Sequence, residues 1–283
     1  MSDFLMRAQA PLSDAEWQVL DHTVVQVARR NLVARRFLSI HGPVGAGVQT
    51  FASDRFAEGE TGRVSLFGAE EEDMVAIQSR RFLPLPLLYR DFRLEWRDLE
   101  ASRRLNTPLD ATAAAVAAAA VAQVEDQVIF NGHDELQQQG FLNADGRQML
   151  PLGNWNASGG GFGAVVSAVQ ALIGRSFRGP FTVVVPPQLF ALLNRVFDNT
   201  GVLEIDQIRR LAGGGVYVTP TLPPNTAIVV AAGRENMDLL IAQDMVTAFL
   251  ETTAMEHHFR VLESLSLRVK QPGAICTLGQ VSS

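Results

Sequence analysis

A glycine-rich stretch in the middle of the chain has residue spacing that could do chemistry. In SGGGFGAVVSAVQALIG, Gly159, Gly161 and Ala164 fit the G-x-G-x-x-G/A spacing with which a strand-to-helix turn binds a pyrophosphate. Such a turn must follow a buried strand, yet the preceding PLGNWNA has the composition of a loop. The region that should carry an acidic residue for the ribose reads RGPFTVVV and has none. The sequence therefore favours a surface loop and a helix over a nucleotide site.

Other titratable residues form no catalytic or metal-binding pattern that we recognise. The chain has no G-x-S-x-G, H-E-x-x-H, C-x-x-C or P-loop motif. Glu125 and Asp126 are adjacent on a predicted helix and so do not share a face. His257 and His258 would point to opposite faces of a strand, and a solvated turn is expected at 133–135. We predict no catalytic residue, no metal site and no cofactor, and hence no enzyme.

Composition narrows the possible partners and compartment. Apolar residues make up 47% of the 283 residues, charged residues 19%, and the net charge is −6. A low charged fraction suggests that much of the surface contacts protein, and an acidic chain is a poor partner for nucleic acid. Cys276 is the only cysteine, so no intrachain disulfide can form, and the start of the chain does not resemble a signal peptide. We expect a cytoplasmic protein with no membrane span.

Two helices are strongly indicated. Ser13 and Glu16 form a capping box that begins the first, and apolar residues then recur at helical spacing at Trp17, Leu20, Val24, Val27 and Ala28. This stripe is typical of core packing, although it could also dock another peptide. The second helix, LDATAAAVAAAAVAQVEDQVIFNG, has Asp110 as its expected N-cap and Gly132 just beyond its end. Its small side chains allow close packing, so we interpret it as a central spine.

The remaining segments predict an extended arm and an α/β lobe. Phe92, Leu94 and Trp96 alternate with polar residues and predict a half-buried strand, while Pro84 and Pro86 place the preceding residues at an edge or in an arm. Strands and short helices alternate from about residue 140 to residue 233. The last 50 residues are rich in strands and should pair with the first part of the chain.

Several stretches in order resemble the encapsulins, bacterial shell proteins related in fold to the major capsid proteins of tailed phages. No one stretch is decisive, but together they extend from about residue 4 to residue 278. They are FLMRAQAPLSDAEWQVLD, ARRNLVARRFLSIHGPVGAGVQT, YRDFRLEWRDLEA, VEDQVIFNG, GPFTVVV, TGVLEI, GRENMDLLIAQDMVTAF and RVLESLSLRVKQPGAI.

The resemblance implies an α+β, HK97-like capsid fold divided along the chain into a P-domain, an E-loop and an A-domain. The implied division is a lumen-facing helix and P-domain start at 1–50, an E-loop arm at 51–98, a spine helix at 99–134, an A-domain at 135–225 and P-domain strands at 226–283. It also implies a homo-oligomeric icosahedral shell of about sixty subunits or a small multiple. The shell would enclose enzymes that carry short terminal targeting peptides. Ferritin-like iron oxidases are favoured, which implies iron storage under oxidative stress, and dye-decolourising peroxidases are a further option.

The resemblance also implies two functional sites. A groove for the cargo peptide would use Val27, Leu32, Arg35, Ser39, Met245, Thr247 and Phe249. Many relatives have an acidic residue at the position of Ser39. A fivefold pore would be formed by Asn199, Thr200, Gly201 and Val202.

Two alternatives remain from the sequence. One is a prophage major capsid protein that packages DNA, which the acidic net charge disfavours. The other is a stand-alone enzyme that uses the glycine-rich turn. Some phage relatives cross-link a lysine of the arm, but Lys270 is the only lysine here and lies outside the predicted arm. The shell is therefore expected to be held together without covalent bonds.

Overall fold

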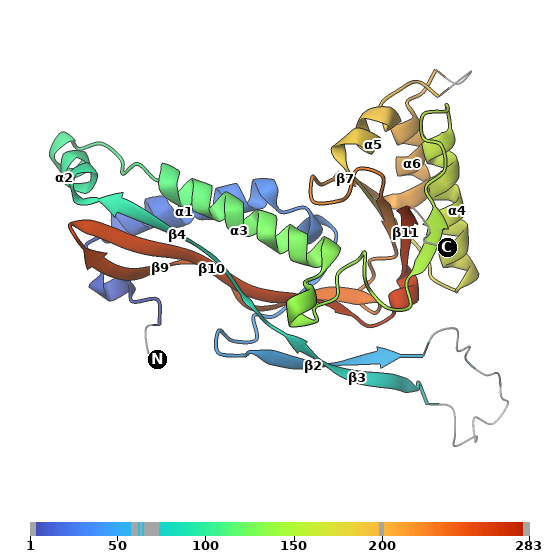
Figure 1. Ribbon diagram of the computed structural model, residues 1–283, viewed down its shortest axis with the longest axis horizontal. Helices are drawn as coiled ribbons and strands as arrows, with labels where there is room; N and C mark the ends of the chain where they lie inside the picture. The colour runs from blue at the N-terminus through green and yellow to red at the C-terminus, as the bar shows by residue number, and fades with distance from the viewer. Residues whose placement is uncertain (1–3, 58–61, 63, 65–73, 198–200, 280–283) are drawn as a thin grey trace.

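The chain forms a long lobe, a compact second lobe and a projecting arm, as the computed structural model shows (Figure 1). The structure describes residues 4–57, 62, 64, 74–197 and 201–279. The helices are α1 (Asp14–Asn31), α2 (Trp96–Leu105), α3 (Thr112–Asn131), α4 (Gly160–Gly174), α5 (Pro187–Leu193) and α6 (Glu204–Ala212), with short 3-10 turns η1 (Arg7–Gln9), η2 (Ala34–Arg36), η3 (Asp134–Leu136) and η4 (Pro272–Ala274). The strands are β1 (Ile40–His41), β2 (Thr50–Phe56), β3 (Ile77–Pro84), β4 (Leu87–Glu95), β5 (Gln148–Pro151), β6 (Phe181–Val185), β7 (Gly213–Val218), β8 (Ala227–Val230), β9 (Met237–Thr253), β10 (Glu256–Val269) and β11 (Ile275–Gly279).

The long lobe is built on a hairpin of two unusually long strands, β9 and β10. Its sheet has the order β1-β9-β10-β4, and β10 pairs antiparallel with both β9 and β4. The hairpin turns at Ala254 and Met255, whose φ values of +49° and +66° give the left-handed backbone of a two-residue hairpin turn. The prediction that the C-terminal strands pair with the first part of the chain is confirmed by the pairings to β1 and β4.

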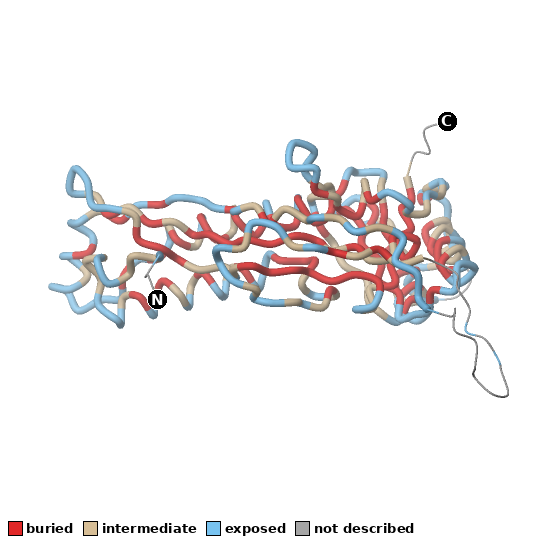
Figure 2. The backbone as a smooth tube through the Cα atoms, turned by 90° about the horizontal axis from the view of Figure 1, so that it is seen from below, coloured by how far each residue is buried: buried red, intermediate tan, exposed pale blue. Residues whose placement is uncertain are grey.

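Helices α1 and α3 cover one face of this sheet (Figure 1). The capping box at Ser13 and Glu16 is present, and α1 buries Trp17, Leu20, Val24 and Ala28. The rings of Trp17, Phe92 and Phe249 surround the ring of Phe259, with centroids 5.3 to 5.8 Å from it. Buried residues extend along the length of the lobe, as the red band in Figure 2 shows.

The N-cap of the spine helix lies one residue later in the sequence than predicted. The N-cap of α3 is Ala111, while the carboxylate of Asp110 accepts a hydrogen bond from the backbone N–H of Thr112 at 2.9 Å. The Asp110 prediction was thus wrong by one position, although its side chain still satisfies a free N–H at the helix start. Gly132 is the C-cap as predicted, with φ at +78°. This helix is long and apolar enough to span a membrane, but 56% of that stretch is buried, as in a core helix.

The predicted strand around Phe92 ends earlier than its alternating pattern suggested. Phe92 and Leu94 are buried in β4, but Trp96 begins α2 and is 36% exposed. Trp96 was therefore wrongly assigned to the strand. The alternating pattern of the sequence does not show where the strand ends. The Trp96 N–H donates to the carbonyl of Met255, which lies 159 positions away in the sequence.

The arm is a separate two-stranded sheet of β2 and β3. Pro84 ends β3 and Pro86 lies in the link to β4, so neither interrupts a ladder, in agreement with the predicted edge position. Polar contacts hold the strands of the arm to the loop after α3. The amide oxygen of Gln139 accepts hydrogen bonds from Arg55 at 2.5 Å and from Arg81 at 3.0 Å, and its amide nitrogen donates to Asp145 at 2.7 Å.

The second lobe is a five-stranded sheet of order β5-β11-β8-β6-β7, with α4 and α6 packed against it. Strand β6 is fully buried, as its apolar sequence predicted. Strands β8 and β11 belong to this sheet, although the predicted boundary at residue 226 assigns them to the long lobe. Likewise β4, assigned to the arm, pairs with β10 of the long lobe. The boundaries drawn along the sequence could not follow these pairings, which are long-range.

Enlarging a buried side chain of the spine should destabilise the subunit. Ala118 is fully buried, so Ala118→Leu is expected to lower the free energy of unfolding by about 1–3 kcal/mol, because the packed sheet leaves no room for the added carbons. Urea unfolding followed by far-UV circular dichroism measures this. Val116→Leu on the same helix, at a side chain that is 66% exposed, is the control and should change stability by less than about 0.5 kcal/mol. Equal effects of the two substitutions would contradict this packing.

Candidate functional site

A groove lies where the end of α1 passes β9. Its volume is about 450 Å³. Its lining residues come from α1 and the turn after it and from one point on β9, and they are Val25, Ala28, Arg29, Leu32, Arg35, Arg36, Asp244 and Met245. Ala28, Leu32 and Ala122 form a small buried apolar cluster against which Met245 packs. The groove therefore has an apolar floor and a charged rim.

Three of the seven predicted groove residues line this cavity: Leu32, Arg35 and Met245. The other four lie elsewhere. Val27 packs against the main core, and Thr247 and Phe249 are buried. The carbonyl of Ser39 accepts a hydrogen bond from the N–H of Leu239. Phe249 contacts Phe259 edge-on at 5.4 Å, so it belongs to the core of the long lobe.

The groove residues that the sequence did not single out are Val25, Arg29, Arg36 and Asp244, whereas Ala28 belongs to the apolar stripe that was named as a possible docking face. Spacing offered a signal for Ala28 and Leu32, which are four positions apart along the helical stripe. Asp244 had no clear signal, because β9 also contains Asp238 and Glu251. The geometry that brings it into the groove is a bulge, which no periodicity shows.

The bulge lies in β9 opposite Glu263. Gln243 pairs with Ser264 and Val246 with Leu262, so two residues of β9, Asp244 and Met245, stand opposite the single residue Glu263. An extra residue in one strand leaves backbone groups without ladder partners and redirects side chains. Here it turns Asp244 and Met245 towards the end of α1.

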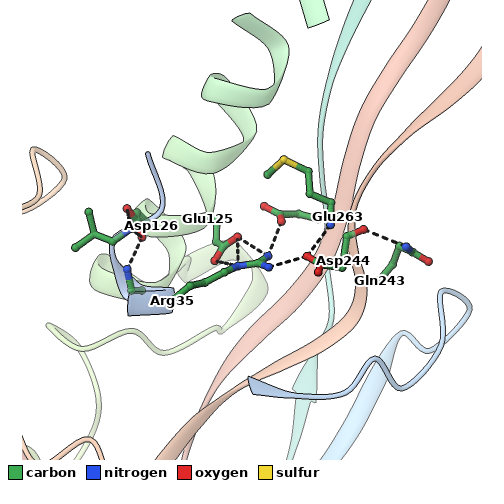
Figure 3. A network of polar contacts seen from close by, with 9 residues as sticks. Arg35, Glu125, Asp126, Gln243, Asp244 and Glu263 are labelled. Atoms are coloured by element: carbon green, nitrogen blue, oxygen red, sulfur yellow. Dashed lines mark hydrogen bonds and ion pairs between the residues drawn. The ribbon is translucent and has the colours of Figure 1, made fainter. Parts of the chain in front are cut away.

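Arg35 links the groove to three carboxylates (Figure 3). Its guanidinium donates to Glu125 at 2.8 Å through both Nε and Nη2, to Glu263 at 2.9 Å and to Asp244 at 2.6 Å. The side chains of Glu125 and Glu263 are fully buried, whereas that of Asp244 is 61% exposed. The turn after α1, the spine helix and the β9–β10 hairpin are thereby connected through one cation.

One cation does not balance two buried carboxylates. Burial, followed by the negative charge of Glu125, raises the pKa of Glu263 well above its usual range, although the charge of Arg35 opposes the shift. Its Oε1 is buried and has no hydrogen-bond partner among the described residues. Burial by itself would lower the pKa of Arg35, but the hydrogen bond and charge of Glu125 and the charge of Glu263 outweigh it and raise that pKa. The Glu263 carboxyl therefore binds a proton more readily than a carboxyl in water does.

Asp126 bonds to backbone N–H groups, whereas its neighbour Glu125 bonds to Arg35. The Asp126 carboxylate accepts hydrogen bonds from the N–H groups of Val33 at 3.0 Å and Ala34 at 3.1 Å, at the start of η2 (Figure 3). Burial raises its pKa to about 6, although these hydrogen bonds lower it. The two adjacent carboxylates point in different directions, as predicted, and together they fix the turn that carries Arg35.

The glycine-rich turn is occupied by the chain itself. Gly159 caps α4 with φ at +75°. The N–H of Phe162, in the first turn of that helix, donates to the carboxylate of Glu204 at 2.7 Å, and the Glu204 side chain is fully buried beside Arg195. An internal anion thus takes the place that a phosphate would take at this helix start. The residues between β5 and α4 form the predicted loop, but a partly exposed strand, β5, does precede the turn and ends at Pro151, so the prediction that no strand leads in was wrong.

The other candidates add no chemistry. No group of three or more histidine, cysteine or acidic side chains in the described part of the chain is placed to hold a metal ion. His257 bonds to Thr252 at 2.9 Å, and burial lowers its pKa. Of the predicted pore, Asn199 and Thr200 lie outside the described residues. Gly201 has φ at +68°, and the carbonyl of Val202 accepts a hydrogen bond from Phe197 at 2.8 Å.

Comparison with known proteins gives consistent matches over nearly the whole chain. A family model described as "Encapsulating protein for peroxidase" matches residues 1–266. The chain is 50% identical to the type 1 encapsulin shell protein EncA of Myxococcus xanthus over 278 residues, 98% of this chain and 97% of that one. It is 24% identical to a ferritin-like-encapsulin shell fusion protein of Pyrococcus furiosus over 221 residues, 78% of this chain and 59% of that one.

The fold has a counterpart among solved structures. The virus-like particle from Pyrococcus furiosus has a subunit that matches with a TM-score of 0.76 at 20% identity, over 93% of this chain and 98% of that one. The described chain is a mixed helix and sheet structure of the same kind. The predicted α+β, HK97-like capsid fold is confirmed.

Replacing Glu263 by glutamine should flatten the pH dependence of stability. The raised pKa means that the folded subunit binds this proton more tightly than the unfolded chain. Its contribution is therefore present at low pH and is lost as pH rises from about 4.5 towards the raised value. Glutamine keeps the shape without the charge. The urea midpoint of Glu263→Gln should thus gain on that of the parent as pH rises from about 5 to about 8.

Glu251→Gln is the matched control, because Glu251 is an exposed acidic residue on β9 away from the network. Its midpoint should follow that of the parent at each pH. Parallel curves for the parent and Glu263→Gln would show that Glu263 is ionised in the folded subunit.

Proposed function

Because the chain belongs to the encapsulin shell proteins, we propose that about sixty copies of it, or a small multiple, assemble into a closed shell that encloses guest enzymes. Each guest carries a short terminal peptide that binds the groove between α1 and β9. The shell resides in the cytoplasm, and its subunit has no catalytic part in the chemistry of the guest.

The groove is the observation that carries this proposal. It combines an apolar floor of Ala28, Leu32 and Met245 with an arginine at its rim, on a helix whose capped start and buried face hold it rigidly. Such a slot can bury one or two aliphatic anchors, each contributing roughly 1.5–3 kcal/mol. A short peptide with such anchors can bind there without a large interface.

A ferritin-like iron oxidase is the guest that we favour. In the relative from Pyrococcus furiosus a ferritin-like part and an encapsulin shell part are named on one chain. A guest held by a peptide would achieve without fusion what that protein achieves by fusion. The function would then be iron storage and protection against oxidative stress. A peroxidase of the dye-decolourising type is the alternative guest, favoured by the description of the matching family.

The arm supports self-assembly. Its two strands pair with each other and are tied to the body by hydrogen bonds such as that from the N–H of Phe56 to the carbonyl of Lys270, yet they expose large apolar side chains, including Phe82 at 71% and Ile77 at 54%. Apolar side chains on a projecting hairpin have no core of their own to enter and are expected to pack on a neighbouring subunit. Lys270 donates to the carboxylate of Asp238 at 2.9 Å and lies outside β2 and β3, so the contacts of the arm are proposed to be non-covalent.

Met245→Asp tests the groove. A carboxylate placed on the apolar floor would be desolvated by any aliphatic anchor, so shells should form but carry less than about a tenth of the guest. Shells are purified from the organism that encodes the chain, and co-purifying proteins are identified by mass spectrometry. Met255→Asp, at an exposed turn of the same hairpin, is the matched control and should load normally. Undiminished guest in Met245→Asp shells, or parent shells without any guest, would refute the proposal.

Phe82→Asp tests the arm. The subunits should remain folded, because this side chain lies outside the core, but they should fail to form shells because the apolar contact with a neighbour is lost. Circular dichroism measures folding, and negative-stain microscopy with light scattering measures assembly. Phe82→Leu keeps the contact and should assemble. Normal shells from Phe82→Asp would show that this face of the arm is not needed.

A further inference from the structure

We propose that the edge of β9 from Gln243 to Val246 binds the guest peptide as an added β-strand, and that the side chain of Asp244 occupies part of this edge when no peptide is bound. This inference rests on the proposed function of the groove and specifies how the peptide binds. The occupant is a short extended segment with apolar side chains.

Both ends of this edge of β9 already bond to other backbone segments. Strand β1 pairs with it only at Leu239 and Leu240. The N–H groups of Val44 and Gly45 then donate to the carbonyls of the next two residues, Ile241 at 2.9 Å and Ala242 at 3.0 Å. At the far end the N–H of Phe249 donates to the carbonyl of Leu5 at 2.9 Å. The edge is thus covered by backbone on both sides of the stretch from 243 to 247.

Between these two ends, side chains form hydrogen bonds to the backbone of β9. The carboxylate of Asp244 accepts the N–H of Met245 at 2.8 Å, and the amide of Gln243 donates to the carbonyl of Asp244 at 3.0 Å (Figure 3). The guanidinium of Arg7 donates to the carbonyl of Thr247 at 3.0 Å. Each of these side-chain groups stands where the backbone of a neighbouring strand would bond. Exposed edges are covered in this way to prevent unwanted strand pairing, and such cover can be displaced by a specific strand.

Asp244 can be displaced without being left as an isolated charge. The Oδ1 that accepts the Met245 N–H also accepts Nη1 of Arg35 at 2.6 Å, and Arg35 is fixed by the buried Glu125 and Glu263. When a carbonyl of the peptide takes the Met245 N–H, the carboxylate keeps its ion pair. It is also 61% exposed, so water can reach it.

The groove selects the side chains of the added strand. The four positions from 243 to 246 are at least partly exposed, whereas Thr247 is fully buried beneath Arg7, so the edge accepts about four residues of an extended partner at about 3.4 Å per residue. Side chains on one face of that strand would meet the apolar surface of Ala28, Leu32 and Met245. Arg29 and Arg36 line the same groove, so a cationic side chain directly over it is disfavoured. The segment in the groove is therefore apolar at alternate positions and carries no positive charge there.

The test uses a fluorescent protein that carries the last ten residues of the guest recovered with native shells. It is produced together with the full-length shell chain, and fluorescence per shell measures loading. Proline is placed in turn at each position of the peptide and compared with alanine at the same position. Because proline removes one backbone N–H, strand addition predicts that loading falls about three- to tenfold at every second position only.

The substitution Asp244→Ala provides an independent test of strand addition. Removing this carboxylate frees the Met245 N–H for the peptide, so loading at limiting guest should rise severalfold. Glu251→Ala, an exposed acidic residue on the same strand, is the control and should leave loading unchanged. Lower loading in Asp244→Ala would mean that Asp244 binds the guest directly. That result, or a proline profile without alternation, would overturn strand addition while leaving a loaded shell, and with it the proposed function, intact.

Discussion

The guanidinium of Arg35 lies between two carboxylates that are buried completely, and the arrangement of the long lobe around the groove depends on it. Glu125 comes from the spine helix and Glu263 from β10, and the guanidinium hydrogen-bonds to both, so the buried charge of Arg35 has partners on two different elements. The turn that delivers Arg35 is itself held by Asp126. The end of α1, the spine and the hairpin therefore adopt one relative position, because any other would leave a buried charge unpaired.

The groove is a consequence of that position. The bulge in β9 occurs opposite Glu263 and turns Asp244 towards Arg35, which opens the surface beside Met245 next to the end of α1. A regular strand would direct these residues into the ladder and leave a flat edge. The same local irregularity thus completes the charge network and creates the apolar floor.

Polar and apolar groups are distributed differently in the lobes and in the arm. The lobes bury long aliphatic strands and the Phe259 cluster, whereas the arm exposes Phe82 and Ile77 and is tied to the body by polar contacts at Gln139. A subunit with a self-sufficient core and an apolar projection is suited to association with copies of itself. This division agrees with membership of a shell-forming family.

The sequence alone determined the local features. The capping box at Ser13, the end of the spine at Gly132 and the buried β6 depend on neighbouring residues, and each was predicted. Resemblance in sequence order also indicated the fold. Only the tertiary structure decided what depends on distant partners: that Trp96 leaves its strand, that β8 and β11 join the second lobe, and that Phe249 is core while Asp244 lines the groove. The physical reason is that pairing register, a bulge and a shared buried cation are set by residues up to 228 positions apart, which no local periodicity records.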